Sequence, residues 1–101
     1  MAVSAEYLDK VRRAVRRSVN AETDEELTDI IEECRHDLIC LGIKPEKTMD
    51  EKDPLILGAV RCFARWEIGL DNGVAPLNRE VYFVLRDELR KRVEYCTFQT
   101  K

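Results

Sequence analysis

The sequence has few of the residues that usually carry out catalysis. It contains a single histidine, His36, and none of its serines or cysteines stands in a recognisable nucleophile motif. Its four glycines are scattered, which excludes a glycine-rich phosphate-binding loop. Acidic pairs such as Asp50 and Glu51 fall where helix caps and exposed loops favour them, without an apolar pocket to tune them for acid–base chemistry. We therefore predict that the chain is not an enzyme and needs no cofactor.

The spacing of metal ligands is also missing. No two of the four cysteines are separated as in a Cys-x2-Cys motif, and on a helix His36 would point away from the nearby Cys34. The sequence therefore predicts no metal site. The cysteines at positions 34, 40, 62 and 96 are expected to be reduced, buried and packed as small apolar residues.

Long apolar segments are absent as well. No run approaches the ~20 residues that a membrane-spanning helix requires, and Met1–Ser4 lacks the basic and apolar regions of a secretory signal. We expect a protein that stays in the cytoplasm, or in a particle that is assembled in the cytoplasm, and that has no membrane partner.

The composition that remains is typical of a small ordered domain. Of the 101 residues, 45% are hydrophobic and 37% are charged, and the formal net charge is −3. This balance argues against disorder and against polyanion binding by the molecule as a whole. We predict one domain over residues 1–95 and a short, flexible C-terminal tail over residues 96–101.

Hydrophobic periodicity predicts an all-α fold, a small bundle of four main helices at about residues 4–19, 23–41, 53–69 and 78–95. Ser4 is the expected N-cap of the first helix, and Thr23 with Glu26 forms a capping box for the second. Gly42 is expected to end the second helix in the left-handed conformation. Residues 43–52 and 70–77 are predicted as loops.

The third predicted helix is apolar on nearly every side, which is unusual for a surface helix. Asp53 is its expected N-cap and Pro54 its first residue, and only a thin polar strip around Arg61 and Arg65 interrupts its apolar surface. This pattern predicts the central helix of the bundle. The predicted core takes residues from three helices: Leu27, Ile30, Ile31, Leu38, Ile56, Val60, Phe63, Trp66, Leu85 and Leu89.

A cluster of arginines is the sharpest electrostatic feature: Arg12, Arg13, Arg16 and Arg17. On one exposed helix face, these guanidinium groups can contact DNA phosphates, pair with the acids of a neighbouring subunit, or remain solvated. The acidic balance of the chain favours the protein interface, and no helix has the groove-facing side chains of a DNA reader.

Two aromatic residues stand near the other end of the chain. Tyr95 and Phe98 either anchor a partner or pack onto the base of the bundle.

A family resemblance begins at the third predicted helix. The chain resembles the head–tail connector proteins of long-tailed bacteriophages, also called head-completion or adaptor proteins, in the pattern Asp53-Pro54-Leu55-Ile56-x-x-Ala59 and the later Gly69-x-Asp71-Asn72. Three further segments also resemble helices of these proteins. Leu8–Val15 resembles their first helix, Asp24–Ile31 their second, and Tyr82-x-x-Leu85-x-x-x-Leu89 their closing helix. The resemblance covers most of residues 7–90.

The resemblance implies structural work in a virion and not catalysis. Such proteins form a ring of about 12 or 13 copies, in which each copy presents two complementary faces to its neighbours. The ring joins the capsid portal to a stopper or tail-completion protein and extends the DNA channel, so DNA is cargo and not a ligand. The implied location is the head–tail interface of the virion, with assembly in the host cytoplasm.

The resemblance suggests which residues meet between subunits. The hypothetical subunit interface pairs the basic first helix with acidic positions: Arg12, Arg13, Arg16 and Arg17 with Glu22, Asp24, Glu25 and Glu32. Tyr95 and Phe98 are the hypothetical portal contacts. Two alternatives remain open, namely a small helical DNA-binding or regulatory protein of a prophage and a helical accessory subunit of an enzyme.

Overall fold

The computed structural model of the chain describes residues 3–16, 20–68 and 75–96. These residues form five α-helices and a 3-10 turn: α1 (Ala5–Ala14), α2 (Ala21–Cys40), α3 (Pro45–Thr48), α4 (Pro54–Ile68), α5 (Ala75–Arg90) and η1 (Val93–Tyr95). The predicted all-α fold is confirmed. Within the described part of the chain, β-type pairing is limited to an isolated antiparallel bridge between Ile43 and Cys96.

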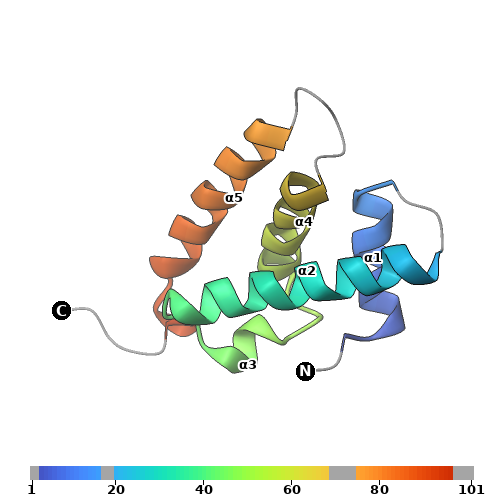
Figure 1. The fold of residues 1–101 in the computed structure, drawn as a ribbon. Helices are drawn as coiled ribbons and strands as arrows, with labels where there is room; N and C mark the ends of the chain where they lie inside the picture. Colours follow the sequence, from blue (N-terminus) through green and yellow to red (C-terminus); the bar gives the residue numbers. More distant parts are fainter. Residues whose placement is uncertain (1–2, 17–19, 69–74, 97–101) are drawn as a thin grey trace.

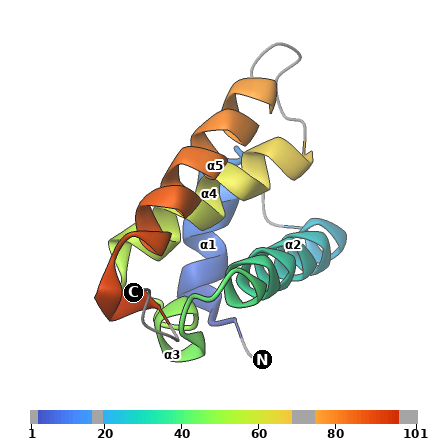
Figure 2. The ribbon, with the colours of Figure 1, turned by 90° about the vertical axis from the view of Figure 1, so that its left-hand side faces the viewer.

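The four longer helices lie in two layers. α5, α4 and α1 follow one another in a row, with α4 in the middle, as its apolar character predicts (Figure 1). α2 crosses this row as a second layer and packs on both α4 and α1 (Figure 2). No helix among the described residues is both long enough and apolar enough to cross a lipid bilayer.

α1 is shorter than the sequence predicts. Ser4 caps it as expected, and the Ser4 Oγ accepts a hydrogen bond from the Tyr7 backbone N–H at 3.1 Å. The helix ends at Ala14, not near residue 19, because Arg16 adopts a left-handed conformation with φ of 56° that a right-handed helix cannot contain. Residues 17–19 of the predicted helix lie outside the described residues.

α2 begins two residues earlier than predicted. Asn20 is its N-cap, since the Asn20 Oδ1 accepts hydrogen bonds from the backbone N–H groups of Glu22 at 2.9 Å and Thr23 at 3.3 Å. The predicted capping box at Thr23 is therefore wrong, because Thr23 lies inside the first turn of a helix that Asn20 caps.

The C-terminal end of α2 follows the prediction. Gly42 has a φ of 108°, and its N–H donates to the carbonyl of Ile39 at 3.0 Å. The Ile43 N–H donates to the carbonyl of Leu38, also at 3.0 Å, which completes a Schellman motif. Ile43 and Leu38 are both fully buried, so the motif also contributes to the core.

The connection between α2 and α4 contains a helical turn that the sequence analysis assigned to a loop. Pro45 opens α3, where its missing N–H needs no partner, and the Thr48 hydroxyl donates to the Lys44 carbonyl at 3.0 Å. Asp53 then caps α4 as predicted, because its Oδ1 accepts from the N–H groups of Leu55 at 2.9 Å and Ile56 at 3.3 Å.

α5 is displaced toward the N-terminus relative to the prediction. It begins at Ala75, before the expected Asn78, because a proline at position 76 fits the first turn of a helix. It ends at Arg90, and η1 replaces the last turn that was predicted to reach Tyr95.

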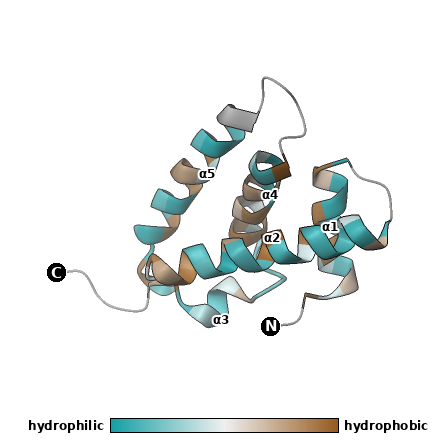
Figure 3. Ribbon diagram, in the orientation of Figure 1, coloured by the Kyte–Doolittle hydropathy of each residue, from teal (hydrophilic) through white to brown (hydrophobic). Residues whose placement is uncertain are grey.

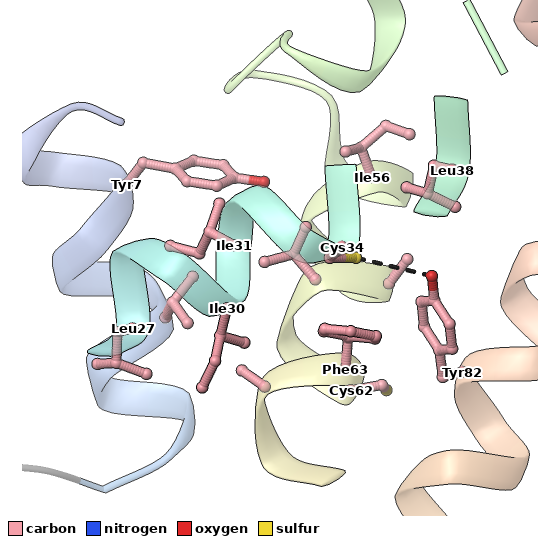
Figure 4. Packing of buried hydrophobic residues seen from close by; sticks show 14 of the residues in the cluster. Tyr7, Leu27, Ile30, Ile31, Cys34, Leu38, Ile56, Cys62, Phe63 and Tyr82 are labelled. Atoms are coloured by element: carbon pink, nitrogen blue, oxygen red, sulfur yellow. Dashed lines mark hydrogen bonds between the residues drawn. The ribbon is translucent and has the colours of Figure 1, made fainter. Parts of the chain in front are cut away.

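The core lies where α2 covers α4, and apolar residues concentrate along α4 (Figure 3). Eight of the predicted core residues are buried: Leu27, Ile30, Ile31, Leu38, Ile56, Val60, Phe63 and Leu89. Trp66 and Leu85 are partly exposed and pack against this cluster. Tyr7, which was not predicted in the core, and Tyr82, which was expected on the inner face of the last helix, fill its two sides (Figure 4).

The cysteines divide into two groups. All four are free thiols; Cys34 and Cys62 are buried as predicted, whereas Cys40 is exposed and Cys96 is partly exposed. The prediction that all four are buried is wrong for Cys40, which lies on the outer side of the last turn of α2, and for the partly exposed Cys96.

Candidate interaction surfaces

The arginine cluster does not form one exposed face. Arg12 is only 8% exposed. Its Nε donates to the Asp24 Oδ1 at 3.0 Å and its Nη1 to the Asp9 Oδ1 at 2.7 Å. Arg12 and Asp24 therefore tie α1 to α2 within one chain, and their assignment to a contact between subunits stays a prediction.

The other members of the hypothetical subunit interface are spread over the surface. Arg13 is exposed and pairs with Asp9 at 3.2 Å. Arg16 is exposed, and Arg17 lies outside the described residues. On α2, Glu22 and Glu25 are exposed and Glu32 is half-buried.

A basic groove runs between α1 and α4. It has a volume of about 310 Å³, and its walls are formed by Lys10, Arg13, Ala14, Arg61 and Arg65. The Arg65 Nε donates to the Ala14 carbonyl at 3.1 Å, which holds this guanidinium group against the end of α1. Apart from the pair formed by Arg13, the described residues contain no ion pair to these cations. The groove is therefore a concentration of positive charge on an otherwise acidic protein.

An acidic face covers the outer side of α2. A hollow of about 400 Å³ there is lined by Asp29, Glu32, Glu33 and His36. The buried residues of α2 lie on its other side, against the rest of the molecule, so the acidic face is on the outer side of the helix. α2 contributes no residue to the basic groove. The two charged surfaces thus belong to different sides of the molecule.

The C-terminal segment is fixed to the loop that follows α2. Tyr95 is 7% exposed, and its hydroxyl donates to the Asp53 Oδ2 at 2.6 Å. The Tyr95 carbonyl accepts from the Lys44 N–H at 2.7 Å. Tyr95 is therefore part of the core and is not an exposed anchor for a portal, whereas Phe98 lies outside the described residues.

A buried charged network joins α1, α2 and the segment before α4. Arg35 is 1% exposed, lies 3.5 Å from the Glu51 carboxylate and stacks over the Tyr7 ring at 5.4 Å. Ser4 donates to the same carboxylate through its backbone N–H, at 3.0 Å, and through its hydroxyl. Burial opposes the charge of Glu51, but these hydrogen bonds and the Arg35 guanidinium outweigh it and lower the pKa of Glu51.

The sequence analysis missed this network. Arg35 follows Ile31 by four residues and therefore falls on the apolar side of α2, which is the one signal that could have indicated it.

A second polar cluster joins α2 to α5. The Tyr82 hydroxyl donates to the Asp37 Oδ2 at 2.6 Å, and the Arg86 Nη1 lies 3.1 Å from the same oxygen. The Cys34 Sγ contacts the Tyr82 hydroxyl at 3.8 Å (Figure 4). Burial raises the pKa of Cys34 to about 12, which keeps this thiol protonated and unreactive at neutral pH.

The described residues thus offer two charged surfaces, one of each sign. Within the same residues, no group of three or more histidine, cysteine, aspartate or glutamate side chains is placed to hold a metal ion. The guanidinium groups of the basic groove can bind carboxylates or phosphates, and the acidic face can bind cationic side chains. Comparisons of the chain with protein families, with curated proteins and with solved structures find no match.

Proposed function

We propose that this chain is a head–tail connector of a long-tailed bacteriophage, which forms a ring between the capsid portal and the tail or stopper. The observation that carries the proposal is the pair of oppositely charged surfaces on different sides of one small helical unit. A ring requires each copy to present two different, complementary faces to its neighbours. The basic groove and the acidic face have that property.

The order of the helices supports the same proposal. The motifs that resemble the connector family lie on or directly beside α1, α2, α4 and α5, the four longer helices of the described residues, except Gly69-x-Asp71-Asn72, which lies outside the described residues. Two of these motifs have local structural roles. Asp53 caps α4, and Tyr82 and Leu89 point from α5 into the interior.

The overall charge suits a DNA channel. At a net charge of −3, the molecule as a whole repels phosphates weakly. A strongly basic lumen would retain the DNA that has to pass through it. We therefore propose that the basic groove is used between proteins and does not line the channel.

The proposal is tested by the mass of the assembled protein. Light scattering is measured on the purified chain alone and on the chain mixed with the portal protein encoded in the same phage genome. We expect either a particle of about twelve times the 11.8 kDa chain mass or a ring of that stoichiometry bound to the portal. A monomer that does not bind the portal would contradict the proposal.

The second candidate function is a small DNA-binding or regulatory protein of a prophage. The basic groove favours it, because clustered cations, of which only Arg13 has an ion-pair partner among the described residues, can contact phosphates. A shift of duplex DNA in gel electrophoresis that weakens steeply with salt would support this candidate over the connector.

A further inference from the structure

We infer that the basic groove of one copy receives the acidic face of α2 from a second copy, so that the chains associate head to tail. The inference rests on the proposed connector function and names the contact that would build its ring. The contact joins Lys10, Arg13, Arg61 and Arg65 of one copy to Asp29, Glu32 and Glu33 of the next.

The groove suits carboxylates in its chemistry and in its rigidity. Three of its four cations are arginines, whose planar guanidinium groups bind carboxylates through two parallel hydrogen bonds. Arg65 is already held by its bond to the Ala14 carbonyl. Because less side-chain freedom is lost on binding, an ordered arginine contributes more to association than a mobile one.

The two surfaces cannot satisfy each other within one chain. The acidic face lies on the outer side of α2, whose opposite side is buried against α1 and α4. Among the described residues, those that line the groove come from α1 and α4. The complementary charges can therefore meet only between copies. This favours a second copy over DNA as the occupant of the groove, since the chain itself supplies the matching anions.

The internal bond between Arg12 and Asp24 gives the contact a defined geometry. Arg12 lies on α1, which forms one wall of the groove, and Asp24 lies on α2, which carries the acidic face. Since this partly buried pair fixes α1 against α2, it also fixes the angle between the two surfaces. In a head-to-tail assembly, that angle decides whether the chain of copies closes into a ring or continues as a filament.

The test uses two charge-reversed variants and a matched control. The groove variant carries Lys10→Glu and Arg61→Glu, and the face variant carries Asp29→Lys and Glu33→Lys. The control carries Glu46→Lys and Glu80→Lys, two exposed positions outside both surfaces, with the same change of charge as the face variant. Neither Lys10 nor Arg61 takes part in an ion pair within the described residues, so helicity measured by circular dichroism should be unchanged in all three.

We expect each surface variant alone to associate at least about tenfold more weakly than the wild type in sedimentation velocity, alone or on the portal, while the control associates normally. An equimolar mixture of the two variants should recover assembly, because each reversed surface then meets a reversed partner. If both variants assemble as the wild type does, the inference is wrong and the connector proposal still stands. If the wild type neither associates nor binds the portal, both are wrong.

A cross-linking experiment identifies the contact directly. A zero-length carbodiimide is added to a mixture of unlabelled and ¹⁵N-labelled wild-type chains, and the peptides are analysed by mass spectrometry. We expect amide links between the Lys10 Nζ of one isotopic form and Asp29, Glu32 or Glu33 of the other. Absence of such mixed links, or loss of duplex DNA binding in the groove variant alongside unchanged association, would overturn the inference.

Discussion

Arg35 carries a positive charge into the interior, at a position where apolar periodicity alone would place a leucine or an isoleucine. Its charge is compensated by Glu51, which lies in a different segment, and by the face of the Tyr7 ring. A buried charge is tolerated when its partner and its hydrogen bonds are well placed, and loss of the partner is costly. The contributions of single residues in this protein therefore depend on partners that are distant in the sequence.

The first prediction at this scale concerns acid stability. The folded pKa of Glu51 lies below its ordinary value of 4.5, so its contribution is fully present above that pH and is lost as the pH falls through the folded pKa. We expect Glu51→Gln to lower the free energy of unfolding by about 1–3 kcal/mol near neutral pH. The difference from the wild type should shrink as the pH falls below 4.5, the ordinary value of this carboxyl. Urea denaturation over a series of pH values measures it, and a difference independent of pH would contradict the assignment.

The second prediction compares two tyrosines with the same substitution. Tyr95→Phe removes the hydroxyl that donates to Asp53, and we expect a loss of about 1–2 kcal/mol in the free energy of unfolding. Tyr7→Phe is the matched control, because the Tyr7 hydroxyl is buried without a hydrogen-bond partner among the described residues. That substitution should be neutral or slightly stabilising. Equal effects of the two substitutions would show that the Tyr95 bond contributes nothing.

Among the elements, helix starts depend on which of several possible caps is used. Ser4 and Asp53 cap their helices as the sequence predicts, because each is the one suitable residue before an apolar run. Before α2, Asn20 and Thr23 are both good caps, and the chain uses the first. Before α5, the proline at position 76 looked like part of a loop but occupies the first helical turn.

A comparison of two single substitutions tests the start of α2. Asn20→Ala should destabilise the protein by about 1 kcal/mol, since the N–H groups of Glu22 and Thr23 lose their acceptor. Thr23→Ala should change stability by less than about 0.5 kcal/mol, because alanine is a better helix former inside the first turn. Thermal unfolding followed by circular dichroism distinguishes the two. A larger loss of stability from Thr23→Ala than from Asn20→Ala would instead support the predicted capping box at Thr23.

Across the whole molecule, α2 is the element that connects the parts. It packs on α4 through the core, bonds to α1 through Asp24, and bonds to α5 through Asp37. Its outer side is left to carry the acidic face. One helix therefore both holds the domain together and presents a surface to the outside. Because the inner and outer roles are separate, we expect the proposed assembly and the folding of the chain to respond differently to the solvent.

The prediction at this scale concerns how ionic strength changes the assembly and the stability of the protein. Raising the ionic strength from about 0.05 M to about 0.5 M should weaken assembly at least about tenfold, because the proposed contact pairs partly exposed charges. The midpoint of urea unfolding of the monomer should hardly change, since an apolar core screened from water holds the fold. Sedimentation velocity and urea denaturation in the same buffers measure the two effects. Assembly that strengthens with salt would indicate a mainly apolar contact instead.

The sequence by itself determined the features that depend on near neighbours. Apolar spacing predicted the four longer helices, and the residues Ser4, Gly42 and Asp53 predicted three of their ends. These features follow from backbone geometry and hydrogen bonds within a few residues, so they are visible in a single segment. Most of the core was predictable for the same reason, since one periodic stripe on each helix has to be buried.

The tertiary structure alone decided which charged side chains remain at the surface, where they can contact another molecule. Arg12 and Arg13 are adjacent in sequence, but one is buried against Asp24 and the other faces a groove. Periodicity shows which side of a helix is apolar and does not show which other helix will cover it. The basic groove joins Lys10 to Arg61 across two helices far apart in the chain, so no local pattern could indicate it. The candidate interaction surfaces therefore follow from packing, because only packing brings distant charges together.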